Sequence, residues 1–118
     1  MSAVPAMIRE RLRGDLATAR EARRAGERER SWELLEDAHV LSQPWWGWHV
    51  RVHASMLVAG MLARDGREVW GQCLRLVVAG PGSVLGRFPA GNPGRARVPA
   101  TQPMPIRDDL AELLRAAR

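Results

Sequence analysis

Apolar residues recur at helical spacing through the first two thirds of the chain. The first apolar stripe consists of Ile8, Leu12, Leu16 and Ala19. Its intervals of four, four and three predict a helix over about residues 5–25, which Gly26 can close in a left-handed conformation. A second helix is predicted over about residues 27–42, because apolar residues cover one wide face and acidic residues the other. Pro44 then ends it, since the residue before a proline avoids the helical region.

Two further helices follow after short turns. The third begins within residues 45–48, and its predicted core stripe consists of Trp46, Val50, Ala54, Leu57 and Met61. After a turn at Asp65 and Gly66, a fourth helix is predicted over about residues 67–79, ended by the Gly80–Gly82 segment. Its apolar stripe consists of Val69, Trp70, Cys73, Leu76 and Val77. Connections this short predict antiparallel neighbours.

The last third of the chain has a different composition. Residues 83–105 contain three Gly, five Pro, three Arg and no acidic residue, so no regular element fits them. They form either an extended arm or a flexible tail, and their scattered apolar residues favour the arm. A short helix is predicted over residues 106–117. We therefore expect an all-α fold with a helical domain over residues 1–82. The arm and C-terminal helix, residues 83–118, should pack on it within a single domain.

The first hairpin resembles a tetratricopeptide-type repeat. The matching positions in residues 17–44 are Ala19, Ala22, Gly26, Trp32, Leu35, Ala38 and the final proline. Residues 46–82 make a weaker second copy. The resemblance implies two helical hairpins, and because three units are usual for a stable array, the C-terminal part would act as a cap.

A second resemblance covers most of the chain after residue 17. It is carried by AHVLSQP (38–44), WHVRVHASML (48–57), GPGSVLGRFPAGNPGRARV (80–98) and PMPI (103–106). These segments resemble a family of small bacterial proteins known only as a domain of unknown function. This likeness implies no reaction, so candidate chemistry has to come from the residues themselves.

All three histidines lie within 15 residues, at His39, His49 and His53. His49 and His53 are four apart and project from one side of a helix, and a turn near Pro44 would bring His39 to their level. The predicted stripe of the third helix puts His49 and His53 at the border of the core. The sequence thus indicates a transition-metal site for Zn, Cu(II), Ni or Co. The competing interpretation is a set of interface histidines that bind no metal.

The charge pattern favours a cation near the same place. Residues 31–45 carry a net charge of −3 in a chain of +5. Glu36 lies one helical turn before His39 and could supply a fourth ligand or orient an imidazole. Cys73 lies on the apolar stripe of the fourth helix, so we expect a buried, unreactive thiol there.

Three tryptophans open the third helix. Trp46 belongs to the predicted core stripe, and Trp45 and Trp48 cannot both point the same way as it does. At least one of these two should stay partly exposed, where it could bind a protein partner.

Composition removes several other classes of function. All 18 basic residues are arginine, which indicates a coding bias, so the pI near 11.3 is weak support for nucleic acid. The longest apolar or glycine run, residues 56–63, is eight residues long and cannot span a membrane. Arginines precede any stretch that could form a signal peptide. We therefore expect a cytoplasmic protein that binds neither nucleic acid nor membranes.

These observations favour a non-enzymatic binding protein whose ligand is a protein partner or a transition-metal ion at the corner of the second and third helices. Two alternatives stay open. One is a metal-dependent enzyme that uses the three histidines. The other is an interaction scaffold without metal.

Overall fold

Five helices make up the regular structure of residues 3–118, the part of the chain that the computed structural model describes. They are α1 (Ala6–Arg24), α2 (Arg28–Ser42), α3 (Trp46–Leu62), α4 (Gly66–Val84) and α5 (Asp108–Ala116). No strand occurs among these residues. The all-helical prediction is therefore confirmed, and its helix boundaries agree closely with the structure except at the end of α4.

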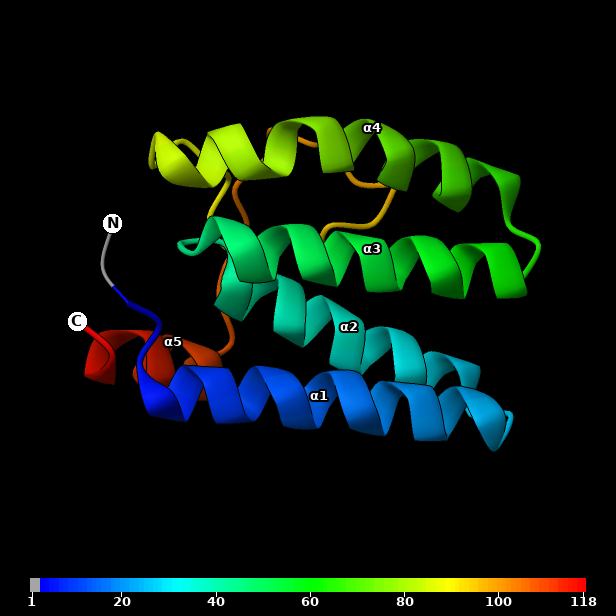
Figure 1. The fold of residues 1–118 in the computed structure, drawn as a ribbon, viewed down its shortest axis with the longest axis horizontal. Helices are drawn as coiled ribbons and strands as arrows, with labels where there is room; N and C mark the ends of the chain where they lie inside the picture. The colour runs from blue at the N-terminus through cyan, green and yellow to red at the C-terminus, as the bar shows by residue number, and fades with distance from the viewer. Residues whose placement is uncertain (1–2) are drawn as a thin grey trace.

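The helices are arranged as two antiparallel hairpins. Helix α1 packs along α2, and α3 packs along α4, while α2 lies against α3 and joins the two pairs (Figure 1). Each of the three connections is only three residues long, at residues 25–27, 43–45 and 63–65. Helix α5 packs on α1 and α2. The start of α1 and helix α5 thus lie on the same side of the molecule (Figure 1).

The apolar core lies mainly where α1, α2 and α3 meet. Ile8 and Leu12 of α1, Leu41 of α2, and Val52 and Met56 of α3 are completely buried. The predicted stripe of α1 is therefore the face that packs.

The predicted core stripe of α3 is wrong. Trp46 is 47% exposed and Met61 is 52% exposed, whereas the buried face contains Val52 and Met56 together with two histidines. Helix α3 carries apolar residues around most of its circumference, so its pattern does not select one face. The buried face of α3 is instead the one that carries His49 and His53, which the pattern placed at the border of the core.

Helix α4 also presents a different face from the one predicted. Its buried side consists of small and polar residues, Glu68, Gly71, Gln72, Ala79 and Ser83. Trp70 and Val77 are 68% and 74% exposed, and Cys73, expected to be buried, is exposed as well. The inner side of α4 is polar because it serves a hydrogen-bond network, which leaves its apolar residues on the surface.

Helix α4 continues through Pro81 to Val84 instead of stopping at Gly80. A proline removes one helical hydrogen bond, but its own carbonyl can still accept, and Pro81 accepts from the backbone N–H of Leu85 at 3.0 Å. The last turn is also tied to the neighbouring hairpin, because the Ser83 hydroxyl donates to the backbone oxygen of Gln43 at 2.5 Å. These contacts outweigh the local signal for termination.

The segment between α4 and α5, residues 85–107, is held against the helices. The side-chain amide of Asn92 donates to the carbonyls of Pro99 and Gln102, which folds the segment on itself. Arg75 of α4 donates to the carbonyls of Arg95 and Val98 at 3.2 and 2.8 Å. We call residues 85–107 the arm.

No helix within residues 3–118 combines the length and the apolar character that a membrane span requires.

Met56 and Met61 allow a direct test of which face of α3 is buried. Met56→Ala should lower the free energy of unfolding by about 2–5 kcal/mol, because Met56 is completely buried. Met61→Ala on the same helix should change it by less than about 0.5 kcal/mol, since Met61 is exposed. Urea denaturation followed by circular dichroism measures both. Equal losses in the two variants would contradict this orientation of α3.

Candidate metal centre

The three histidines come together inside the protein. His39 lies near the end of α2, and His49 and His53 lie one turn apart at the start of α3. The short connection at residues 43–45 places these two helix ends side by side. His39, His49 and His53 are 3%, 5% and 2% exposed, so all three residues are buried. Their ring nitrogens lie close enough together to bind one metal ion.

Two of the rings are held through Nδ1 by oxygen atoms. His39 Nδ1 lies 2.6 Å from the backbone oxygen of Asn92, which can only accept. His49 Nδ1 lies 2.8 Å from Ser83 Oγ. Because the Ser83 hydroxyl donates its one hydrogen to Gln43, its oxygen accepts from His49. Both rings therefore carry their hydrogen on Nδ1 and leave Nε2 unprotonated.

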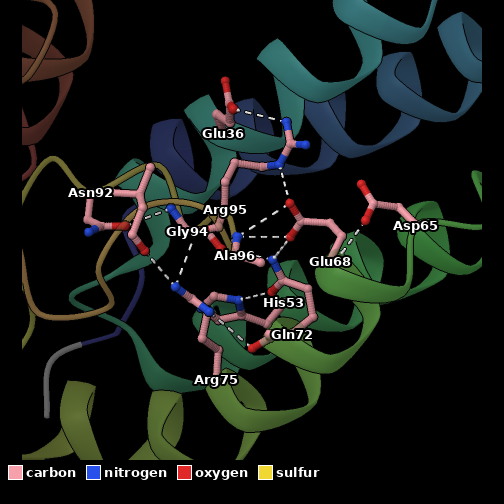
Figure 2. A network of polar contacts seen from close by, with 12 residues as sticks. Glu36, His53, Asp65, Glu68, Gln72, Arg75, Asn92, Gly94, Arg95 and Ala96 are labelled. Carbon is pink, nitrogen blue, oxygen red and sulfur yellow. Dashed lines mark hydrogen bonds and ion pairs between the residues drawn. The ribbon is translucent and has the colours of Figure 1, made fainter.

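The third ring, that of His53, is also hydrogen-bonded through Nδ1, in this case to a residue of α4. His53 Nδ1 lies 2.6 Å from Gln72 Oε1. The Gln72 amide nitrogen donates to Glu68 Oε2 at 2.7 Å and to the backbone oxygen of Gly94 at 2.8 Å (Figure 2). Both of these partners accept, which fixes the amide with its oxygen toward His53. His53 thus also donates from Nδ1 and leaves Nε2 free to bind.

The three Nε2 atoms face one another. They are separated by 3.1 Å (His39 to His53), 3.1 Å (His39 to His49) and 3.2 Å (His49 to His53). These distances would suit hydrogen bonds, but each ring already uses its hydrogen at Nδ1. Three lone pairs therefore converge on one point, an arrangement that is repulsive by itself and favourable around a cation.

Burial keeps the cluster neutral. Desolvation lowers the pKa of His39 well below its usual value near 6.5. It lowers the pKa of His49 and of His53 to about 4, with the neighbouring His53 ring adding to the effect on His49. The positive charge of Arg75 acts in the same direction on His39 and His53. Neutral imidazole is the form that binds a metal.

The separations fit a transition metal. A triangle with sides near 3.1 Å has its corners about 1.8 Å from its centre. An ion with Zn–N bonds of about 2.0–2.1 Å would lie about 1 Å to one side of that plane. Three nitrogens on one side of an ion leave the opposite position open, as in tetrahedral sites with three protein ligands.

A buried carboxylate, that of Glu68, stabilises the residues that hold the histidines. Glu68 accepts from Gln72, from Arg95 Nε at 2.6 Å and from the backbone N–H of Ala96 (Figure 2). The Arg95 guanidinium in turn lies over the Trp32 ring, 3.8 Å from its centroid. Through Glu68, the arm is thereby connected to Gln72, the residue that orients His53.

Glu36 lies outside the cluster. Its carboxylate pairs with Arg95 Nη1 at 3.4 Å, and burial raises its pKa. The acidic face of α2 thus holds the arm and supplies no ligand. The acidic residue that helps to orient an imidazole is instead Glu68, which holds Gln72, which in turn holds His53. This role of Glu68 was not predicted from the sequence.

Several supporting residues were not recognised from the sequence. Gln72, Ser83 and Asn92 hold the three Nδ1 atoms, and they come from α4 and the arm. Glu68 and Gln72 are four residues apart, so they share one face of a helix. This pair of polar residues on one face was the sequence feature that could have indicated a polar, buried side of α4. Asn92 acts through its backbone, which leaves no signal in its residue type.

Gly94 closes the arm over His39. Its φ is +84°, and a Cβ built there would lie 2.6 Å from His39 Cδ2 and 2.9 Å from His39 Nε2. Only glycine combines this conformation with such a close approach to the ring.

A cavity of about 510 Å³ reaches the cluster. All three histidines line it, together with residues of α4 and the arm, among them Arg75, Arg87 and Phe88. No carboxylate lies among its lining residues. The cavity offers a route by which small molecules could approach the histidines.

The burial of the tryptophans differs from the prediction. Trp45 is 8% exposed and belongs to the core, whereas Trp46, expected in the core, is exposed. Trp48 is partly buried and packs against the core, with the Arg51 guanidinium 4.5 Å from its ring centroid. Of the two candidates for partner binding, Trp45 is buried and Trp48 is partly exposed.

Fold and site together define an all-helical protein with a buried three-histidine cluster. A family model described as "Protein of unknown function (DUF3703)" matches residues 6–114, so the chain belongs to this family. Neither the curated proteins nor the solved structures yielded a match. The match confirms the resemblance to a domain of unknown function and leaves function to be argued from the site.

Proposed function

We propose that this protein binds one divalent transition-metal ion through Nε2 of His39, His49 and His53. The observation that carries the proposal is the convergence of three unprotonated Nε2 atoms within 3.2 Å of one another. Metal-binding histidines characteristically donate their other ring N–H to an oxygen acceptor, and here all three do. A cluster of histidines that served only packing would have no need to point three lone pairs at one another.

Zinc is the first candidate among the metals. Three nitrogens on one side of the ion suit tetrahedral coordination, which Zn²⁺ and Co²⁺ accept readily. Square-planar Cu(II) or Ni(II) would need ligands spread around the ion in one plane. We exclude Glu36 from the proposed ligands, since its carboxylate pairs with Arg95.

A metal-dependent enzyme is the second candidate, and the cavity favours it. Three protein ligands leave a position for water, and zinc lowers the pKa of bound water to about 7. The cavity that reaches the histidines could admit a substrate. No carboxylate lines the cavity to act as a general base, so a metal held by His39, His49 and His53 would have to supply the ionisation of water itself.

A protein partner, the other ligand expected from the sequence, draws its support from α4. Its exposed apolar residues, with Trp70 at 68% exposure, form a surface of the kind that interfaces use. Trp45 is buried in the core and does not contribute to such a surface.

Titration with Zn²⁺ or Co²⁺ tests the main proposal. Protein purified without a polyhistidine tag and stripped of metal should bind one equivalent, measured by calorimetry. His53→Ala should weaken binding more than about 100-fold, because even loss of an outer partner typically costs 10–100-fold. Glu36→Gln should keep wild-type stoichiometry. Absence of saturable binding by folded wild-type protein would refute the proposal.

Gly94→Ala tests the closure of the arm over His39. The new Cβ would collide with the ring near Nε2, so metal affinity should fall at least about 10-fold. Gly86→Ala is the matched control, because Gly86 also has positive φ, +66°, but open space around it. Both variants carry a similar backbone strain, so only the contact with His39 distinguishes them. Equal metal affinities in the two variants would contradict this role.

Ester hydrolysis tests the second candidate. Zinc-loaded protein should hydrolyse p-nitrophenyl acetate faster than the metal-free protein, with a rate that rises near pH 7 as bound water ionises. His53→Ala should abolish the difference. If the zinc-loaded and metal-free proteins hydrolyse this ester at the same rate, enzymatic use of the site loses its support.

A further inference from the structure

The cavity beside the histidines is lined by apolar residues and two arginines. It measures about 510 Å³, and many of its lining residues are apolar, including Val77, Val78, Leu85, Phe88 and Pro89. Arg75 and Arg87 also line it. Hydrocarbon walls with a few convergent polar groups are typical of sites for small organic molecules.

The charged side chains that line this cavity are all positive, and Glu68, which lies outside the lining, acts on Arg75 without pairing with it. No Asp or Glu lines the cavity, and within residues 3–118 neither Arg75 nor Arg87 forms an ion pair with a carboxylate. Arg75 donates only to backbone carbonyls, at Gly71, Arg95 and Val98. By contrast, the neighbouring Arg95 is neutralised by Glu68 and Glu36.

A metal ion would increase this imbalance. The three imidazoles are neutral, so a divalent ion held by them keeps its full charge of two. The carboxylate of Glu68 reaches the cluster only through Gln72 and His53 and is already paired with Arg95. Fixed positive charge beside apolar walls attracts an anion strongly, because the surroundings screen it less than water does.

We propose that the cavity binds a small organic carboxylate, whose anionic head takes the open position of the metal and whose hydrocarbon part lies along the apolar wall of α4 and the arm. This inference rests on the proposed metal site. Arg87, which is exposed at the cavity, adds attraction for the head group. A cationic or purely neutral ligand would meet no complementary charge there.

Cobalt-substituted protein provides the test, because the visible spectrum of Co²⁺ reports a change of ligand at the metal. Acetate, butyrate and hexanoate should each shift the spectrum saturably. Affinity should rise by about fourfold for each methylene that reaches the apolar wall, as expected from burial of a CH₂ group. Hexanol and hexylammonium, which have the same tail without the carboxylate, should leave the spectrum unchanged.

Two arginine variants separate the cavity from general charge. Arg87→Gln should weaken hexanoate binding about 1.5- to fivefold, the range for one exposed, screened charge. Arg13→Gln removes the same charge from an exposed position on α1 and should have no effect. Both variants should keep one equivalent of cobalt, since neither residue belongs to the centre.

The outcomes are distinguishable. Failure of wild-type protein to bind cobalt refutes the metal site itself. Cobalt binding without a spectral response to any carboxylate leaves the metal site standing and overturns the carboxylate proposal. Equal affinity for acetate and hexanoate, or an equal response to hexylammonium, overturns it as well.

Discussion

The convergence of three neutral imidazoles is the constraint around which the rest of this structure is arranged. Each ring has to be buried, turned with Nε2 toward the others, and supplied with an acceptor for its Nδ1 hydrogen. The acceptors come from Asn92, Ser83 and Gln72. The centre therefore needs α2, α3, α4 and the arm together, and no single hairpin contains it.

This requirement accounts for the unusual polarity of α4. Its inner face carries Gln72 and Ser83 for the rings and Glu68 for the arm, so polar residues occupy positions that packing would otherwise give to leucine. Unpaired polar groups in such a place would be costly, and each one here is hydrogen-bonded. The apolar residues of α4, such as Trp70, consequently face outward.

The arm has a related function in the structure. Arg95 joins the arm to Glu68 and Glu36, and Gly94 allows it to lie directly on His39. A segment rich in glycine and proline, without regular hydrogen bonds of its own, is held in place by buried polar contacts to the helices. It also lines the cavity that reaches the histidines.

The helices, their antiparallel order and the candidate histidines could be predicted from the sequence, because helical spacing, turn residues and the i to i+4 relation of His49 and His53 are local properties. The buried faces of α3 and α4 could not, because they depend on contacts between distant segments. Periodicity ranks faces by hydrophobicity, and it put Trp46 and Cys73 inside. The fold instead buried a hydrogen-bonded polar network that joins distant residues, such as His39 and Asn92, which lie 53 residues apart. Such a network stabilises buried polar residues through partners that no local pattern reveals.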